Sequence, residues 1–242
     1  MKVLISKKTG KYYYYNGSED YHCKEGLIKK EELESGRSTV ISNTEREFYI
    51  FEANLYDRSR KITRGPQLIT EKDLGYIVAR SRMNKDSIVV EAGAGSGAAT
   101  AFFASIAKEV HSYEIREDHA KIVEKNLNLL NLNNVKLTVG DLLEEIKNEK
   151  EIDLLFLDMP DPQEVLNSDL SGVKSGAYIV CYVPSISQIQ EITKVAGEKE
   201  DLYFEEISEV ILRHWRVWER VSRPEHRKEI DHTAFLVFIR KI

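Results

Sequence analysis

Ile88-Val-Val-Glu-Ala-Gly-Ala-Gly-Ser-Gly97 has the pattern of a β-strand that ends in a glycine-rich turn at the start of a helix. Glycines at 93, 95 and 97 remove β-carbons where a backbone must come close to a ligand. The N-terminus of the following helix offers free amide donors. This pattern predicts a nucleotide-like cofactor at the carboxyl end of the strand.

The glycine spacing fits more than one kind of site. Gly93, Gly95 and Ala98 satisfy the dinucleotide pattern G-x-G-x-x-G/A, and a tight turn without any ligand is a further interpretation. Glu91 and the additional Gly97 favour another assignment. The string E-x-G-x-G-x-G resembles motif I of class I S-adenosylmethionine-dependent methyltransferases, whose cofactor has no pyrophosphate. This assignment makes the following residues cofactor-binding: Glu91, Gly93, Gly95, Ser96 and Gly97.

Apolar runs alternate with amphipathic stretches on both sides of this loop. A helix is expected over residues 70–83, with Thr70 as N-cap and Asp73 completing an approximate capping box. Strands and helices then alternate to residue 197, which predicts an α/β fold with a doubly wound, Rossmann-like sheet. A long strand within 201–219 and a last strand over 232–241 have no helix between them, so a closing antiparallel hairpin is expected.

The first sixty residues have a different texture. Short β-like runs at 1–6, 11–17, 21–28, 38–43 and 46–53 are separated by glycine-containing turn signals. This predicts a small N-terminal β domain over residues 1–63, followed by the cofactor-binding domain over 64–242. We interpret Tyr12 to Tyr15 as strand formers in a half-buried hairpin, in preference to an RNA-stacking platform.

Composition limits the class of protein. An apolar share of 42% with 31% charged residues is that of a folded chain. The sequence has no run long enough to span a bilayer and no signal-peptide pattern, so we expect no membrane association and a cytoplasmic location. Cys23 and Cys181 lie far apart and outside zinc-binding spacings, so neither a disulfide nor a metal site is expected.

Charge is distributed unevenly along the chain. The net charge of −5 arises from +3 over residues 1–64, −12 over 65–210, +4 over 211–228 and zero over 229–242. Attraction to phosphate is local, because salt screens charges beyond about 10 Å. An acidic body with a basic segment near each end is therefore compatible with a polyanionic partner.

Acidic residues follow the next two predicted strands. Glu114 ends the strand over 110–115, about twenty residues past the glycine loop, where a carboxylate can bind ribose hydroxyls of either NAD or S-adenosylmethionine. Asp141 follows the strand over 135–141 and has two compatible interpretations. It can accept a hydrogen bond from an adenine amino group, and it can cap the helix that starts at residue 142.

Leu157-Asp-Met-Pro-Asp-Pro162 follows the fourth strand of the predicted sheet, at the edge where substrates bind. Its two prolines restrict the backbone, so Asp158 is expected to face the cofactor rigidly, with Pro160 beside the substrate. A dehydrogenase does not need Asp-x-Pro-x-Pro here, whereas amino-directed nucleic-acid methyltransferases place an acidic or amide residue before proline to engage the target base. A proline-rich turn without function is the alternative.

The chain resembles the TrmI-type tRNA (adenine-N1)-methyltransferases of archaea and bacteria over nearly its whole length. The motifs that carry the resemblance, besides the glycine loop, are Tyr21-His-Cys-Lys-Glu-Gly26, Arg64-Gly-Pro-Gln67, Asp158-Met-Pro-Asp-Pro162, Tyr182-Val-Pro-Ser-Ile-Ser-Gln188, Arg223-Pro224 and His232-Thr-Ala-Phe-Leu236. Two positions depart from the family pattern. Gln163 stands where tryptophan is usual, and Ser175 interrupts the usual Pro-Gly-Gly turn.

The resemblance implies methyl transfer from S-adenosylmethionine to N1 of adenine 58 of tRNA, in some archaeal members also of adenine 57, by a homotetramer. Asp158 would be the catalytic residue, because a fixed carboxylate can accept a hydrogen bond from N6 and stabilise the charge that develops on the base. N1 lies on the Watson–Crick edge, so the base must leave its stack.

Several residues keep two interpretations. Gln67 is a contact to cofactor or target by resemblance, or else a surface amide; His232 lies near the target adenine or is structural. Arginines 213, 216 and 220 alternate with aromatic residues, as on an RNA-binding surface. The same segment also fits a core strand with a charged outer face. The substrate-binding set is therefore Pro160, Arg213, Arg216, Arg220 and His232.

Three rival functions share part of these features. A class I methyltransferase of small molecules, such as a corrin precursor, would share the glycine loop but would not need the N-terminal domain. A non-catalytic tRNA-binding subunit would be expected to have lost the glycine loop and Asp-x-Pro, which are both intact. A dinucleotide oxidoreductase is the least supported of the three.

Overall fold

The computed structural model describes residues 1–63, 69–218, 220–225 and 232–242. The chain forms two compact units, Met1–Ile62 and Thr63–Ile242. The predicted cofactor contact Gln67 and the rest of the junction over residues 64–67 lie outside the described residues. Within the described part of the chain, no helix has the length and apolar character needed to cross a membrane.

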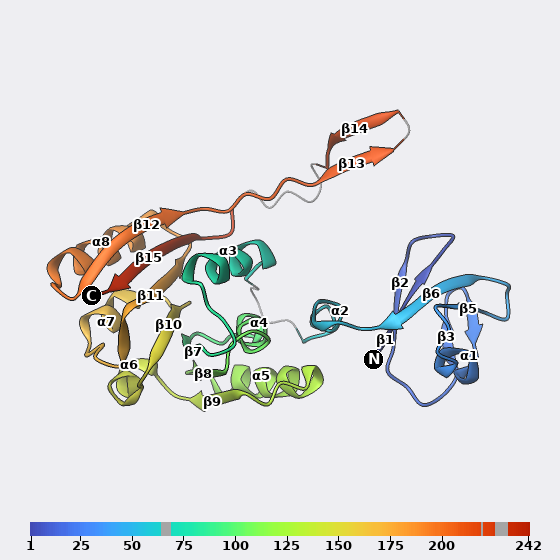
Figure 1. Cartoon of the computed structure of the whole chain (residues 1–242), viewed down its shortest axis with the longest axis horizontal. Helices are drawn as coiled ribbons and strands as arrows, with labels where there is room; N and C mark the ends of the chain where they lie inside the picture. Colours follow the sequence, from blue (N-terminus) through green and yellow to red (C-terminus); the bar gives the residue numbers. More distant parts are fainter. Residues whose placement is uncertain (64–68, 219, 226–231) are drawn as a thin grey trace. The chain divides into compact units, whose positions relative to one another are not determined.

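The N-terminal unit, blue in Figure 1, contains a four-stranded antiparallel sheet of order β2-β1-β6-β5. One face carries the core of the unit, where Leu33 of the first helix and Ile28 of a separate hairpin are buried. All five predicted runs contain strands, but the run over 21–28 folds as a hairpin and the first helix was not predicted. The elements are β1 (Lys2–Ser6), β2 (Tyr12–Tyr15), β3 (Tyr21–Cys23), β4 (Gly26–Ile28), α1 (Lys30–Glu34), β5 (Thr39–Ile41), β6 (Glu47–Glu52) and α2 (Leu55–Ser59).

The tyrosine run forms a half-buried strand, as predicted. Tyr15 is buried, Tyr13 packs against the core, and Tyr12 is exposed. Successive side chains of a strand point to opposite faces, so the run supplies two rings to the core and two to the other face.

The second unit contains a seven-stranded sheet of order β12-β15-β11-β10-β7-β8-β9. Strands β11, β10, β7, β8 and β9 are parallel, and β15 pairs antiparallel with both β11 and β12. The doubly wound α/β class and the antiparallel closing pair are confirmed. The strands are β7 (Ile88–Ala92), β8 (Glu109–Glu114), β9 (Val135–Val139), β10 (Ile152–Leu157), β11 (Val173–Val183), β12 (Leu202–Ser208) and β15 (Phe235–Lys241).

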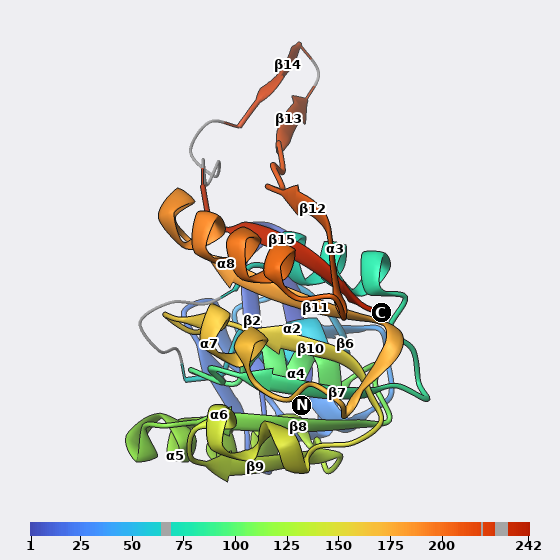
Figure 2. The ribbon, with the colours of Figure 1, turned by 90° about the vertical axis from the view of Figure 1, so that its left-hand side faces the viewer.

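Two apolar layers hold the helices on this sheet (Figures 1 and 2). Along β10, Leu155 and Leu157 belong to one layer, whereas Leu154 and Phe156 belong to the other. Apolar residues at every position of a strand are expected where both faces are buried. The first layer packs on α6 (Leu142–Glu145), α7 (Pro162–Asn167) and α8 (Ile186–Glu198), and the second on α3 (Glu71–Ser81) and α4 (Ala98–Ala104). Helix α5 (Glu117–Leu130) contacts α4, β8 and β9.

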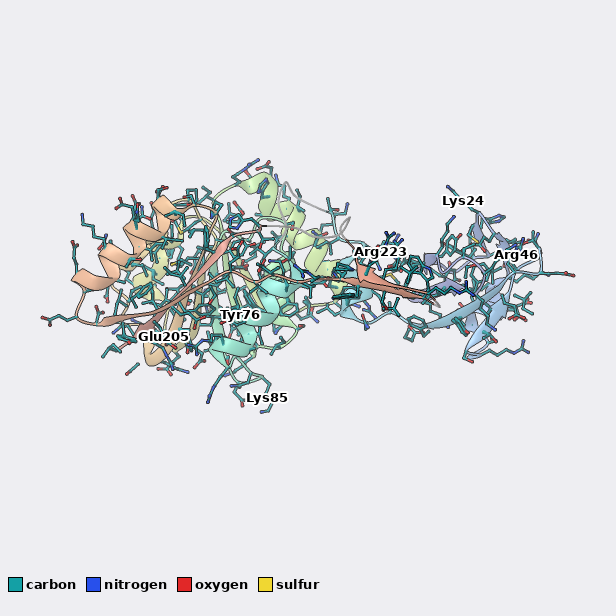
Figure 3. All side chains as sticks on the ribbon, turned by 90° about the horizontal axis from the view of Figure 1, so that it is seen from above. Lys24, Arg46, Tyr76, Lys85, Glu205 and Arg223 are labelled. Carbon is teal, nitrogen blue, oxygen red and sulfur yellow. The ribbon has the colours of Figure 1, made fainter. Side chains whose placement is uncertain are left out.

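Helix α3 is fastened to the edge strand β12 by polar contacts. The hydroxyl of Tyr76 donates to Glu206 at 2.7 Å, and the guanidinium of Arg80 contacts the carboxylates of Glu205 and Glu206. Figure 3 labels Tyr76 on the helix and Glu205 on the strand. The predicted capping box does not form, because the Thr70 hydroxyl donates to the side chain of Asp73 and accepts from no backbone amide.

The predicted long strand within 201–219 is wrong in extent. β12 ends at Ser208, opposite Leu236, and β15 has only one residue beyond that point. Residues past Ser208 therefore have no neighbouring strand in the main sheet. β13 (Trp215–Trp218) instead pairs with β14 (Val221–Pro224) in a separate two-stranded sheet, which projects from the unit in Figures 1 and 2.

The buried side chain of Asn126 on α5 joins the start of this unit to the glycine-rich loop. Its amide nitrogen donates to the carbonyls of Thr63 at 2.9 Å and Ser96 at 2.8 Å, and its oxygen accepts from the Thr63 amide at 2.8 Å. Buried polar groups that lose such partners keep the full cost of desolvation.

We expect Asn126→Ala to lower the free energy of unfolding by about 2–3 kcal/mol, because the buried carbonyl of Ser96 loses its partner and the two bonds to the backbone of Thr63 are also lost. Urea unfolding followed by circular dichroism measures this change. The matched control is Asn128→Ala, an exposed position on the same helix, with an expected change within about 0.5 kcal/mol. Equal losses in the two variants would contradict the structural role of Asn126.

Candidate active site

The glycine-rich loop between β7 and α4 is fixed by backbone hydrogen bonds. The amides of Gly93 and Ala94 donate to the carbonyl of Tyr113 at the end of β8, at 3.0 and 3.3 Å. The amide of Gly97 donates to Ala94 at 2.7 Å and turns the chain into α4. Gly93, Gly95 and Gly97 all have positive φ, a conformation that other residues rarely adopt.

Gly93 also lies against the backbone of Asp158. A β-carbon on Gly93 would be 1.8 Å from the Asp158 carbonyl oxygen, and the amide of Asp158 donates to Ala92 at 2.9 Å. From the sequence, we expect the missing β-carbon at position 93 to make room for a ligand. At position 93, the neighbour that requires glycine is the protein's own chain at the exit of β10.

Glu114 at the end of β8 is held in place by the loop. Its carboxylate accepts from the amides of Gly95 at 2.8 Å and Arg116 at 3.0 Å, and the side chain is almost completely buried. A carboxylate has about four acceptor sites, so two amide bonds leave capacity for ligand hydroxyls. Glu114 therefore stands where the sequence predicts it, at the carboxyl edge beside the glycine loop.

Glu91 has no exposed surface and lies on the α4 side of the sheet. One carboxylate oxygen accepts from the hydroxyls of Thr100 at 2.5 Å and Ser112 at 2.7 Å, while the other is buried without a partner. Burial raises the pKa of Glu91 to about 7 against the opposing effect of the two hydroxyls, and Asp158 and Glu114 raise it further. Sequence reasoning did not identify Thr100 and Ser112, which are visible only once α4 and β8 are packed.

Asp158 is partly exposed just past β10, on the same side of the sheet as Phe156. Within the described residues its carboxylate accepts no hydrogen bond. Burial raises the pKa of Asp158 to about 7, and the charge of Glu114 contributes. Three carboxylates, Glu91, Glu114 and Asp158, thus repel one another around a single loop.

The chain after Asp158 is braced by α8. The carbonyl of Pro160 accepts from the side-chain amide of Gln188 at 2.8 Å, and Ser185 caps α8 through the amide of Gln188. Gln163, the departure from the family pattern, donates to Asp161 at 3.2 Å and buries its own carbonyl oxygen without a partner. Pro160 is exposed beside this segment.

A buried ion pair that sequence reasoning missed lies at the same edge of the sheet. Lys72 contacts Asp73 at 2.9 Å, and its ammonium also donates to the carbonyl of Val210 at 2.5 Å and the hydroxyl of Thr233 at 2.7 Å. Tyr182, at the end of β11, donates to the other oxygen of Asp73 at 3.2 Å. Burial raises the pKa of Tyr182, and the charges of Asp73 and Asp158 contribute to this rise.

Asp141 caps α6, as predicted, because its carboxylate accepts from the amide of Leu143 at 2.9 Å. The predicted helix over 142–149 is α6 followed by one 3₁₀ turn, Ile146–Asn148. Ser96 is buried, with its carbonyl bonded to Asn126.

His232 is exposed beside the carboxyl end of β11. Its Nδ1 lies 2.6 Å from Glu209, and its Nε2 lies 3.4 Å from the carbonyl of Pro184. The Glu209 carboxylate raises the pKa of His232. These contacts fix the ring near the substrate edge, and within the described structure the ring makes no hydrogen bond to Asp158.

The basic segment lies on the exposed hairpin. Trp215, Val217 and Trp218 are 59%, 71% and 47% exposed, so the alternative of a core strand is wrong. Arg216 pairs with Glu225 at 2.8 Å and lies over the ring of Trp218. Arg213 and Arg220 are exposed at either side of β13.

Comparison with known proteins identifies the family. The model of the family described as "tRNA methyltransferase complex GCD14 subunit" matches residues 59–234. The chain belongs to this family. It is 28% identical to the tRNA (adenine(57)-N(1)/adenine(58)-N(1))-methyltransferase TrmI of Methanocaldococcus jannaschii, over 99% of this chain and 94% of that protein.

Solved structures of the same fold cover the whole chain. The tRNA (m1A58) methyltransferase TrmI from Aquifex aeolicus matches with a TM-score of 0.80 and 26% identity, over 100% of this chain and 96% of its own. A SAM-dependent O-methyltransferase from Thermotoga maritima matches with a TM-score of 0.85 and 25% identity, over 100% and 92%. The class I methyltransferase fold with its N-terminal β unit is therefore confirmed.

Without ligand, we expect the free energy of unfolding to fall as the pH rises from about 5 to 8. The folded-state pKa of Glu91 is raised from 4.5 to about 7, so its proton is held more tightly when folded. The Glu91 side chain makes its full contribution to stability at pH values below its unfolded-state pKa, and this contribution is lost as the pH rises through its folded-state pKa. The contribution is on the order of 3 kcal/mol at most. Urea unfolding at a series of pH values measures the slope.

In the same series, Glu91→Gln should flatten the decline, and the further change Asp158→Asn should remove most of what remains, because Asp158 has a similarly raised pKa. Glu124→Gln, an exposed carboxylate on α5, is the matched control and should keep the wild-type slope. A Glu91→Gln slope equal to that of the wild type would contradict this assignment.

Proposed function

We propose that the chain is an S-adenosylmethionine-dependent tRNA (adenine-N1)-methyltransferase that modifies adenine 58 of tRNA, and also adenine 57, as the name of the M. jannaschii relative states for that protein. Family membership and the two TrmI relatives support the reaction. The observation that carries the choice of cofactor is the set of three mutually repelling carboxylates around the glycine loop.

The charge of this site fits a cationic ligand. The charge of Glu114 contributes to the raised pKa of Glu91 and of Asp158, and Asp158 contributes to that of Glu91, so a positive group bound nearby would favour the ionised forms of Glu91 and Asp158. The pyrophosphate of a dinucleotide would instead add negative charge. The second oxygen of Glu91 is a further buried polar group, and it has no hydrogen-bond partner among the described residues.

The residues that would hold S-adenosylmethionine follow from their positions. Glu114, already oriented by Gly95 and Arg116, would accept from the ribose hydroxyls, and Asp141 from the adenine amino group. Gly93, Gly95, Ser96, Gly97 and Gln67 complete the proposed cofactor set. When bound, the cofactor supplies an electrophilic methyl group on positively charged sulfur.

Asp158 is the proposed catalytic residue. N1 of adenine has a free lone pair, so no base is required before attack, but the methylated ring is cationic or must lose a proton from N6. The Asp158 carboxylate, free of other hydrogen bonds in the described structure, would accept the N6 hydrogen bond and stabilise this charge. Pro160 and Gln188 keep the following backbone in place.

The proposal also assigns residues that contact the tRNA outside the methyl-transfer site. We assign tRNA phosphate contacts to Arg213, Arg216 and Arg220 and a place near the target base to His232. The proposal includes a homotetramer and a cytoplasmic location. The exposed apolar side chains of β13, which are unusual on an isolated chain, support the homotetramer. A small-molecule methyltransferase is less favoured, because the family model and the M. jannaschii relative, which matches 99% of this chain, are named for tRNA methylation.

We expect S-adenosylmethionine or S-adenosylhomocysteine to raise the melting temperature, since a ligand that binds only the folded state stabilises it. NAD should leave it unchanged, because its pyrophosphate meets the three carboxylates. Differential scanning fluorimetry at matched ligand concentrations measures both shifts. Glu114→Gln should reduce the S-adenosylmethionine shift, whereas Glu117→Gln, an exposed carboxylate on α5, should not. A shift with NAD alone would contradict the cofactor assignment.

We expect Asp158→Asn to slow methylation of an unmodified tRNA transcript by about 10²- to 10³-fold under single-turnover conditions with saturating cofactor. The amide can still accept one hydrogen bond but cannot neutralise a cation. Nuclease digestion and mass spectrometry should place 1-methyladenosine at position 58 for the wild type. Asp161→Asn, exposed in the same turn, is the control and should stay within about threefold. Wild-type protein that forms no 1-methyladenosine would contradict the proposed function.

A further inference from the structure

The sheet of the N-terminal unit presents an aromatic outer face. Ile5 on β1 pairs with Tyr12 on β2 and with Tyr49 on β6, so these three side chains form one row across the strands. Tyr14 and Phe51 lie in the next row of the same face. We call Tyr12, Tyr14, Tyr49 and Phe51 the aromatic face.

Three rings of the aromatic face are exposed to solvent, whereas Val3, which lies between Tyr14 and Phe51, and the Tyr14 hydroxyl are buried. Tyr12, Tyr49 and Phe51 are 48%, 51% and 43% exposed. Across the sheet, Tyr15 and Phe48 are buried. Adjacent exposed rings on a regular sheet are costly to leave in water and mark a binding surface. Strand spacing puts Tyr12 and Tyr49 about 10 Å apart, with Ile5 between them.

Cations lie over these rings. The guanidinium of Arg60 is 5.4 Å from the ring centroid of Tyr12 and 5.9 Å from that of Tyr56. The ammonium of Lys61 is 4.4 Å from the centroid of Tyr14. Among the described residues, neither cation has a carboxylate within ion-pair distance. Both are therefore available to an anionic partner.

Four acidic side chains of this unit lie on the core side of the sheet. On the aromatic face, Glu47 pairs at 2.6 Å with Lys7, whose ammonium lies over the ring of Tyr49. Helix α1, which packs on the core side through Leu33, carries three carboxylates, and the hydroxyls of Ser6 and Tyr13 donate to another. The acidic residues on the core side are Glu25, Glu31, Glu32 and Glu34.

We infer that the aromatic face is a second RNA-binding surface, which stacks unpaired bases of the tRNA while Arg60 and Lys61 contact the adjoining phosphates. This inference rests on the proposed function for its partner, tRNA. Aromatic rings on a sheet flanked by cations are the chemistry that binds single-stranded nucleic acid, since every base has a face to stack and every link a negative charge.

A second copy of the chain fits this face less well. A two-fold contact presents the same patch from both partners, and it would bring two copies of Arg60 and Lys61 into one interface. Charges of one sign repel there. RNA brings stacking faces together with the opposite charge, so both features of the surface are satisfied at once.

The test compares RNA binding by the full-length wild type and by Tyr12→Leu/Tyr49→Leu. Leucine keeps apolar contact with Ile5 but removes both stacking rings. The matched control is Tyr203→Leu, a 59% exposed tyrosine on β12. Two probes are used, an unmodified tRNA transcript and a short oligouridylate without secondary structure. Fluorescence anisotropy gives the Kd of each, and light scattering gives the oligomeric state.

The double variant should raise both Kd values about tenfold or more, because each stacked base contributes at least roughly fivefold. Single-turnover methylation by the double variant should need a correspondingly higher tRNA concentration to reach half of its maximal rate. Tyr203→Leu should bind as the wild type does. Unchanged Kd values in the double variant would overturn the inference, and so would a change in oligomeric state, which would make the face a protein interface.

A second pair of measurements does not depend on the tyrosine variants folding. Arg60→Gln/Lys61→Gln should flatten the salt dependence of oligouridylate binding, by ~0.7 in the logarithmic slope for each phosphate that is no longer neutralised. Photocrosslinking of wild type with 4-thiouridine RNA should label peptides containing Tyr12 or Tyr49. An unchanged slope, or crosslinks confined to β13 and β14, would overturn the inference.

These outcomes separate the inference from the proposed function. Wild type that forms 1-methyladenosine while all variants bind RNA normally leaves the function standing and removes the aromatic face. In the opposite case, the wild type forms no 1-methyladenosine, but oligouridylate binding is lost when Tyr12 and Tyr49 are replaced. That result would contradict the proposed function and would still support RNA binding at the aromatic face.

Discussion

The contact between Gly93 and the backbone of Asp158 is the constraint on which the site depends. With no β-carbon at position 93, the chain leaving β10 can pass directly against the loop leaving β7, and a hydrogen bond from Asp158 to Ala92 holds it there. The distance between the glycine-rich loop and Asp158, the proposed catalytic residue, is thereby set by backbone atoms. Side chains around it, such as Glu114 and Gln188, orient the two partners but do not determine their separation.

Placing Glu91 and Asp158 at the same loop has an electrostatic cost. Glu91 and Asp158 are gathered in a site that raises the pKa of both to about 7, so the site without ligand holds protons that solvent-exposed carboxylates would have released. Sites that carry such destabilising charge are commonly functional. A cationic ligand would relieve the repulsion, so affinity and stability are coupled through the same three carboxylates.

Local patterns predicted much of this fold. The strand-loop-helix at 88–97, the alternation of elements and the cap formed by Asp141 follow from near neighbours in sequence. Long-range packing determined the rest. The burial of Glu91, the ion pair of Lys72 and the links made by Asn126 depend on segments far apart in the chain. The alternation in Tyr12 to Tyr15 indicates two faces of a strand, but it does not indicate which face is covered. Within the 201–219 segment, no local pattern indicates that pairing with β15 stops at Ser208.

The ammonium of Lys72 bonds to the chain on both sides of the hairpin, at Val210 before it and at Thr233 after it. The buried ammonium of Lys72 thus joins the segment that leads into the hairpin to the segment that follows it. A change in the length or sequence of the hairpin is therefore not transmitted to the rest of the sheet. A hairpin of different length or sequence could therefore follow Val210 without disturbing this junction.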